Sequence, residues 1–324
     1  MMKIIILLLC ICQFKNAASQ KIIEEYIPAT DSLRIGYSKS DFLPYGARGY
    51  TLILPETVEI KATIISLEDY PVDLKDSAER GFIYSEANAR GYAFLYISTG
   101  LPVDLFFTNS SLSYVDETVK KVFTKNQIPN KNIFLQGIMT SGHRALKYIE
   151  YCKKGKSLFR PAVKGVYLCE SVLDWVRQWY EGQKQVRDSL SEAGFFEGNL
   201  VTYLFKKHLK DSPVTNIEKY LEFSPYCYFD TKMRKIPFYK DIAVRAYTFA
   251  DTDYWFSAPG KGVYDSNYPD MSGIINELKL AGSTKAELIV LQKENKTGHH
   301  AKQSSTWELV DKTDLLDWVT KQIN

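Results

Sequence analysis

The stretch "NIFLQGIMTSGHRALKY", residues 132–148, joins a strand-like run to a helix-like run through a short turn. The strand pattern covers residues 132–136, and a helical pattern begins at Gly142. Between them lie Gly137, Met139 and Ser141. Small residues such as Gly137 and Gly142 allow one backbone segment to approach another closely. The stretch therefore predicts a tight strand-to-helix turn with Met139 near its middle.

Strand-like and helical patterns alternate along most of the chain. The predicted strands cover residues 50–54, 63–67, 92–97, 132–136, 163–168, 244–249 and 288–291, and the predicted helices cover 76–90, 112–125, 142–153 and 311–322. Apolar strands that alternate with helices are typical of an α/β fold, a mostly parallel sheet with helices on both faces. Such a sheet places its ligand crevice at the carboxyl ends of the strands.

Residues 173–235 interrupt this alternation. The segment is rich in aromatic residues and has no strand pattern, although its residues favour helices. We interpret it as a helical insertion that caps the crevice. Peripheral helices packed on the sheet edge are the alternative.

The composition limits the classes of protein to which the chain can belong. Its 324 residues, 45% of them hydrophobic, can bury one large core or two small ones. The formal net charge is only +3, and the basic residues form no block. Nucleic acid is therefore not an expected partner.

Residues 1–19 are typical of a secretory signal peptide. A short basic start precedes the apolar run Ile4–Cys12, and the small residues Ala17-Ala18-Ser19 suit a signal peptidase. The apolar run is too short to span a bilayer. We expect a secreted or periplasmic domain over residues 20–324, with no transmembrane segment after cleavage. A buried N-terminal strand and a lipid-modified cysteine are the alternatives.

Three cysteines follow the predicted signal: Cys152, Cys169 and Cys227. An odd number does not form a disulfide framework, and the patterns around them favour buried thiols. One disulfide among them is compatible with the sequence, but none is required.

The turn at Gly137 and the acid Asp251, which follows the strand predicted over 244–249, resemble the α/β-hydrolase superfamily, and in particular its secreted serine hydrolases and esterases. The resemblance in element order extends over most of the chain beyond residue 19. It implies a nucleophile on the strand-to-helix turn, followed later in the chain by an acid and then a histidine. Aligned in this way, Gly137 occupies the first glycine position, Met139 the nucleophile position and Ser141 the second glycine position.

A methionine at the nucleophile position cannot form an acyl-enzyme, because its thioether has no proton to lose. Taking Ser141 as the nucleophile instead would place Met139 and His143 where small residues belong. Ser141 also falls in the first helical turn, where a hydroxyl commonly binds backbone amides. We therefore expect Ser141 to cap backbone amides.

The expected base also departs from the pattern of the superfamily. His299 and His300 lie in the region where the resemblance implies a histidine, and Asp251 would orient one of them. The position two residues before Trp307, where related secreted hydrolases carry their histidine, is Ser305. Adjacent histidines could also suggest a metal, but no second cluster of ligands accompanies them. We expect neither a metal nor a cofactor.

The oxyanion side departs from the pattern as well. The segment after the strand predicted over 63–67 reads Glu68-Asp69-Tyr70-Pro71, where the resemblance implies a glycine-rich turn. Carboxylates there would oppose the negative charge that develops during acyl transfer, and Pro71 has no amide hydrogen.

Two hypotheses follow. Departures at the nucleophile, the base and the oxyanion segment favour a pseudoenzyme that keeps its crevice for a small-molecule, peptide, glycan or lipid ligand. The alternative is an active serine esterase or peptidase that uses Ser141 with Asp251 and His299 or His300. An interaction protein of an extracellular assembly would share the features of the first.

Overall fold

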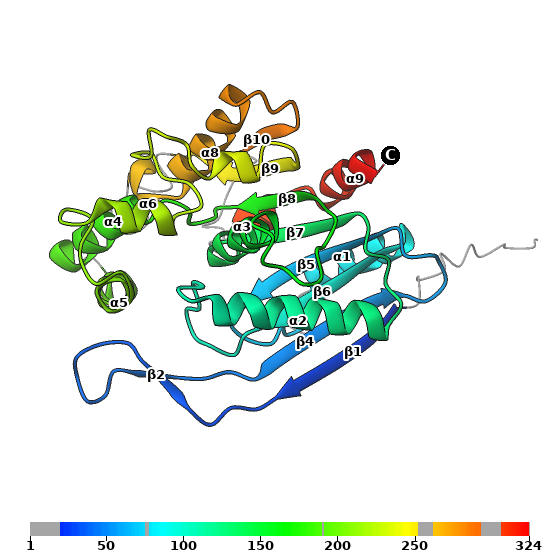
Figure 1. The fold of residues 1–324 in the computed structure, drawn as a ribbon, viewed down its shortest axis with the longest axis horizontal. Coiled ribbons are helices and arrows are strands. Elements are labelled where there is room, and N and C mark those ends of the chain that lie inside the picture. The colour runs from blue at the N-terminus through cyan, green and yellow to red at the C-terminus, as the bar shows by residue number, and fades with distance from the viewer. Residues whose placement is uncertain (1–19, 75–77, 190, 252–261, 293–305, 324) are drawn as a thin grey trace, which may run out of the picture.

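The computed structural model describes residues 20–74, 78–189, 191–251, 262–292 and 306–323. Their centre is an eight-stranded sheet in the order β1-β4-β6-β5-β7-β8-β9-β10 (Figure 1). The strands are β1 (Gln20–Ile27), β4 (Arg48–Pro55), β5 (Ala62–Glu68), β6 (Tyr92–Ser98), β7 (Ile133–Ile138), β8 (Val163–Cys169), β9 (Ala243–Phe249) and β10 (Ala286–Leu291). The pairs β1–β4 and β4–β6 are antiparallel, and the other pairs are parallel. The predicted mostly parallel sheet is confirmed.

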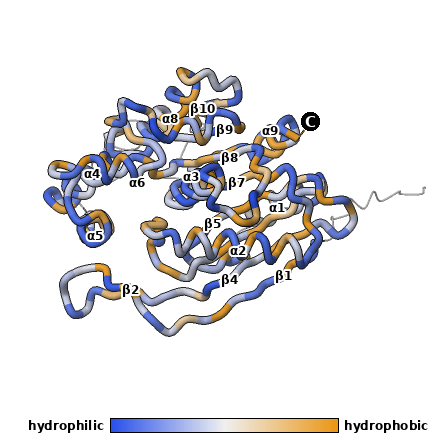
Figure 2. Tube along the Cα trace, in the orientation of Figure 1, coloured by the Kyte–Doolittle hydropathy of each residue, from blue (hydrophilic) through white to orange (hydrophobic). Residues whose placement is uncertain are grey.

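Helices cover both faces of the sheet. The helices of the described residues are α1 (Ala78–Ala89), α2 (Asn109–Lys125), α3 (Thr140–Lys153), α4 (Trp175–Asp188), α5 (Glu192–Leu209), α6 (Ile217–Phe223), α8 (Tyr268–Leu280) and α9 (Lys312–Ile323). One apolar core joins α2, α3 and α8 to the strands, and a second joins α1 and α9 to them. Figure 2 shows apolar and polar residues alternating along α2, as expected of a helix with one buried face.

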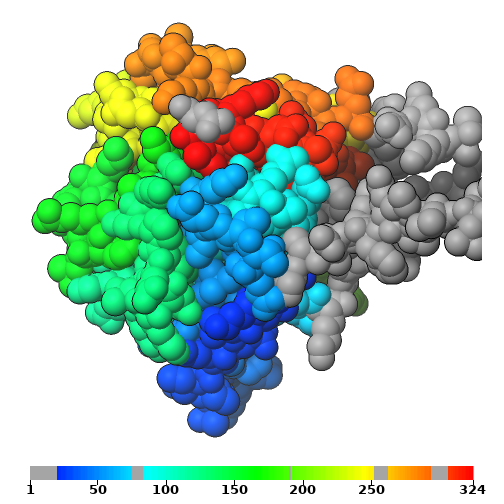
Figure 3. Space-filling model, turned by 90° about the vertical axis from the view of Figure 1, so that its right-hand side faces the viewer, coloured from blue at the N-terminus to red at the C-terminus, as the bar shows by residue number. Residues whose placement is uncertain are grey.

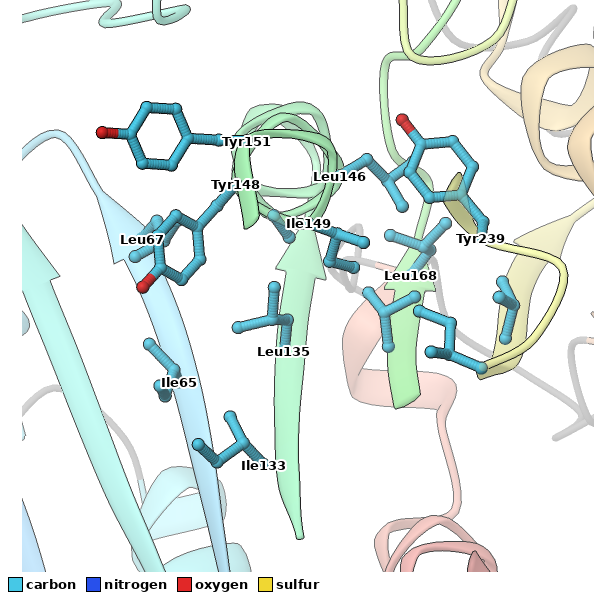
Figure 4. Packing of buried hydrophobic residues seen from close by; sticks show 14 of the residues in the cluster. Ile65, Leu67, Ile133, Leu135, Leu146, Tyr148, Ile149, Tyr151, Leu168 and Tyr239 are labelled. Atoms are coloured by element: carbon cyan, nitrogen blue, oxygen red, sulfur yellow. The ribbon is translucent and has the colours of Figure 1, made fainter. Parts of the chain in front are cut away.

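The strand-to-helix turn is fixed by the packing of α3 on the strands below it. Leu146 and Ile149 of α3 are fully buried and belong to the same core as Leu135 of β7 and Leu168 of β8 (Figure 4). Burying a leucine or isoleucine side chain contributes about 1.5–3 kcal/mol. This packing fixes α3 over the carboxyl ends of the central strands.

The C-terminal helix closes the other face of the sheet. Figure 3 shows α9 beside α1. Arg90, just after α1, donates to Asp317 of α9 at 2.5 Å, and the hydroxyls of Tyr92 and Thr320 are 2.6 Å apart. These contacts join the C-terminal helix α9 to the segment between α1 and β6.

Between residues 173 and 235 the described chain forms α4, α5 and α6 and no strand. Trp175 and Trp179 of α4 pack in one cluster with Phe205 of α5 and Tyr220 of α6. A small two-stranded sheet of β2 (Ser32–Arg34) and β3 (Phe42–Pro44) lies close to α5 (Figure 1). No helix within the described ranges is long and apolar enough to cross a membrane.

Candidate functional site: an elbow that carries a methionine

Met139 lies on a strained turn between β7 and α3, and we call this turn the elbow. Its φ of 52° and ψ of −122° are a backbone conformation that side-chain-bearing residues rarely adopt, at a cost of about 1–3 kcal/mol. The turn is held by hydrogen bonds from the Met139 amide to the Cys169 carbonyl at 3.0 Å and from the Val172 amide to the Met139 carbonyl at 3.4 Å. The methionine side chain is 51% exposed. The predicted turn is therefore present, with a thioether at its tip.

Two glycines make this turn possible. A Cβ atom on Gly137 would lie 2.4 Å from the Cα of Gly142, and a Cβ on Gly142 would lie 2.0 Å from the Ser171 hydroxyl oxygen. Neither approach leaves room for a side chain. The close contact that the sequence predicted for this turn thus falls on Gly137 and Gly142. Ser141, which we align with the second glycine position, does not form it.

Ser141 faces the backbone behind it. Its Oγ accepts a hydrogen bond from the Ile138 amide and donates one to the Ile138 carbonyl, both at 2.7 Å. The residue is 1% exposed, so its hydroxyl is not available to a substrate. The amide that it binds ends β7 and does not belong to the first turn of α3.

The acid and base positions are described only in part. Asp251 lies two residues after the end of β9, at the carboxyl edge of the sheet. His299, His300 and Ser305 lie outside the described residues. Within the described residues, no group of three or more His, Cys, Asp or Glu side chains could hold a metal ion. The three predicted thiols, Cys152, Cys169 and Cys227, are all free cysteines.

His143, which the sequence reasoning treated only as a bulky neighbour of the turn, connects three segments. Its Nδ1 accepts from Trp175 Nε1 at 2.8 Å, so the proton of the neutral ring is on Nε2, which donates to the Leu105 carbonyl at 2.8 Å. Burial, with a contribution from Lys147, lowers the pKa of His143 well below its usual 6.5. Both ring nitrogens are engaged, so His143 holds α4 against α3 and is not a catalytic base.

Arg144 fills the side of the turn where an oxyanion site would be expected. Its buried guanidinium donates to the Leu67 carbonyl at 2.8 Å and forms an ion pair with Asp69. The Asp69 carboxylate also accepts from the amides of Val103 and Asp104, at 3.1 and 3.2 Å. Burial raises the pKa of Asp69, although Arg144 opposes that shift. Backbone amides on this side therefore bind a carboxylate of the protein itself.

A cavity of about 520 Å³ lies over the elbow, and we call it the elbow cavity. Met139 is part of its lining, together with Trp175 of α4, Leu204 and Phe205 of α5, and Trp307. A second hollow of about 580 Å³ also includes Met139 and Trp307 in its lining. The volumes are within the range of small-molecule sites. Met139 thus contributes an apolar surface to both hollows.

Glu170 is a lining residue of the elbow cavity that the sequence reasoning missed. It follows β8 directly and is 4% exposed. One carboxylate oxygen, Oε1, accepts from the Thr248 hydroxyl at 2.8 Å and the Phe249 amide at 2.6 Å, whereas Oε2 has no hydrogen-bond partner among the described residues. Burial raises the pKa of Glu170. The sequence feature that could have identified Glu170 is an acid directly after a predicted strand, here β8 beside β7. The same feature identified Asp251.

No family model matches the chain, and no curated protein matches its sequence. Solved structures match its fold. Pyrococcus horikoshii acylaminoacyl peptidase aligns with 86% of this chain at a TM-score of 0.52 and 13% identity, and the chain spans only 38% of that peptidase. FphF, a fluorophosphonate-binding serine hydrolase of Staphylococcus aureus, aligns over 94% of this chain and 98% of its own, with a TM-score of 0.51 and 15% identity. Fungal esterases from Rhizomucor miehei align over 94% of this chain and 84% of theirs, at a TM-score of 0.51 and 11% identity. The order of strands, the helices on both faces and these matches agree: the chain has the α/β-hydrolase fold.

Proposed function

We propose that this protein is a non-catalytic member of the α/β-hydrolase fold that binds an apolar small molecule in the elbow cavity. The observation that carries the proposal is Met139 on the strained turn, exposed and in contact with the cavity. A thioether has no proton to lose and cannot carry an acyl group. The loss of a nucleophile alone typically reduces turnover about a millionfold.

The residues around Met139 favour ligand binding over catalysis of acyl transfer. Ser141 is buried and bonded to Ile138, so it does not replace the missing nucleophile. Arg144 and the amides of Val103 and Asp104 already bind the Asp69 carboxylate, so they are not available to stabilise the charge of a tetrahedral intermediate. Trp175, Phe205 and Trp307 instead give the cavity apolar walls. Aromatic and sulfur-containing side chains adapt well to varied apolar ligands.

Glu170 gives the proposed ligand a polar contact. Its raised pKa favours the neutral carboxyl, which can donate as well as accept a hydrogen bond. The lining also carries four further acidic residues, Asp69, Glu181, Glu197 and Asp265, so a ligand with an apolar body and hydrogen-bond-donating groups would fit it. The signal-like residues 1–19 support a place for this activity outside the cytoplasm, where the protein would be secreted or periplasmic.

The binding proposal is tested with 1-aminoanthracene, a neutral aromatic probe whose fluorescence rises in apolar surroundings. We expect saturable binding to the full-length mature protein. Leu204→Trp, which adds volume to the cavity wall, should abolish it. Leu158→Trp places the same side chain at an exposed site, 76% accessible, and should leave binding unchanged. Equal binding by all three proteins would contradict the proposal.

The proposed absence of catalytic activity is tested separately with the substitution Met139→Ser. Because Asp69 still occupies Arg144 and the amides of Val103 and Asp104, and Ser305 stands at the expected base position, we expect the hydrolysis of p-nitrophenyl butyrate to stay at background. A clear rise would show that the remaining machinery works and that Met139 alone blocks it.

A further inference from the structure

A second cavity, of about 320 Å³, lies on the far side of the 105–107 segment from the elbow cavity and shares no lining residue with either elbow hollow. We call it the lysine cavity. Four lysines contribute to its lining, namely Lys147, Lys154, Lys156 and Lys219, as do the two glutamates Glu150 and Glu222. Four positive and two negative formal charges leave an excess of two positive charges. The lining therefore favours an anion.

The apolar part of the lysine cavity comes from side chains that are already packed. Phe106, Leu112 and Phe223 are buried, and Phe107 stacks on Phe223 with ring centroids 4.6 Å apart. Tyr151, which extends sideways from α3 (Figure 4), also contributes to the lining. A ligand that fits here needs an apolar body next to its charge.

Lys147 is the least exposed of the four lysines in this lining. Its Nζ is 3.5 Å from the Phe223 carbonyl and 5.1 Å from the centre of the Phe223 ring. No carboxylate within the described ranges lies within 4.0 Å of it. Of the two glutamates in the lining, Glu150 pairs through Oε1 with Lys154 at 2.6 Å and with Lys235 at 2.8 Å, and Glu222 lies 3.8 and 3.6 Å from the same two lysines. A half-buried ammonium without a counter-ion is well placed to bind an external one.

We propose that the lysine cavity binds a small organic carboxylate, whose charged group contacts Lys147 and whose aliphatic or aromatic body packs on the phenylalanines. The site is separate from the elbow cavity and does not depend on the function proposed there. Lys154, Lys156 and Lys219 around it raise the local positive potential and attract the anion.

The pH dependence of binding follows from Lys147. Burial lowers its pKa to about 8, so the anion should bind well below this pH and progressively less above it. The other titratable groups that surround it are His143, Glu150, Tyr151 and Lys154 on α3, Lys156 after it, His208 on α5, Lys219 and Glu222 on α6, and Lys235 before η1 (Ile236–Phe238). Burial lowers the pKa of both histidines, so they stay neutral above pH 7.

The experiment compares 3-phenylpropionate with its uncharged isostere 3-phenylpropanamide by calorimetric titration. We expect the carboxylate to bind at least about tenfold more tightly than the amide, as a buried charge partner requires. Lys147→Met should lose about tenfold in carboxylate affinity, whereas Lys147→Arg should retain it. Lys153→Met, an exposed lysine on the same helix that does not contribute to the lining, is the matched control and should bind as the wild type does.

A pH series provides the second readout. Wild-type affinity should fall between about pH 7 and pH 9, and the affinity of Lys147→Arg should stay flat because arginine keeps its charge. This comparison remains decisive if Lys147→Met does not fold. Equal binding of carboxylate and amide, no binding of the carboxylate at about 5 mM, or an affinity of Lys147→Arg that falls with pH as the wild-type affinity does would overturn the proposal.

Discussion

Gly137 and Gly142 meet backbone to backbone across the elbow, so closely that a Cβ on Gly137 would lie 2.4 Å from the Cα of Gly142. This contact brings the end of β7 against the first turn of α3 and presents Met139 at the tip. The turn thus presents a thioether, which has no proton to lose and cannot act as a nucleophile in acyl transfer.

Gly137→Ala should therefore destabilise the protein by about 2 kcal/mol or more, because both the backbone and Leu168 would have to move. Urea unfolding followed by circular dichroism measures the change. Gly262→Ala is the control, since a Cβ there would come no closer than 3.8 Å to the neighbouring residues that the structure describes, and the substitution should cost less than about 0.5 kcal/mol. Equal effects of the two substitutions would show that the close approach does not constrain the turn.

His143→Leu should destabilise the protein by about 2 kcal/mol at neutral pH, because it leaves the buried Trp175 Nε1 without an acceptor. The pKa of His143 is depressed in the folded state, so its stabilising contribution is present above the unfolded pKa of about 6.5 and is lost as the pH falls below it. Wild-type stability should therefore fall more steeply than that of the variant between about pH 7 and pH 5. Parallel curves of unfolding free energy against pH would mean that His143 is not buried as a neutral ring.

The contribution of Glu170 to stability should depend on pH in the opposite direction to that of His143, and the substitution Glu170→Gln tests this. The raised pKa means that folding favours the neutral carboxyl, so this contribution is present below the unfolded pKa and is lost as the pH rises through the folded one. Glutamine stays neutral, and the variant should gain stability over the wild type as the pH rises from about 4 to 7.5. Glu117→Gln, an exposed site on α2, is the control. A stability difference that does not change with pH would contradict the assigned environment of Glu170.

Much of the fold was predictable because its central strands are buried on both faces. Such strands are apolar along their length, as Tyr92–Ser98 illustrates with every residue buried. The edge strand β1 was missed because only one of its faces is covered, and its sequence, QKIIEEYI, carries charges at three positions. Helix α8 was also missed, although its buried residues Met271, Ile274, Ile275 and Leu278 follow a helical spacing.

The candidate site was predictable only where it depends on local sequence. Met139 and the turn follow from a continuous stretch of chain. The contacts of His143, Arg144 and Glu170 do not, because their partners Trp175, Asp69 and Thr248 are 32, 75 and 78 residues away. Only the packed sheet brings them together, and no periodic pattern encodes that proximity.

Labelling of the full-length protein with a fluorophosphonate probe, read out by mass spectrometry, tests most directly whether the elbow lacks a nucleophile; Ser141→Ala is measured beside the wild type. Because Met139 has no reactive hydroxyl and the Ser141 hydroxyl is bonded to Ile138, we expect no labelling of either protein at the elbow. Stoichiometric labelling of Ser141 in the wild type, abolished in Ser141→Ala, would contradict this expectation and establish an active serine hydrolase.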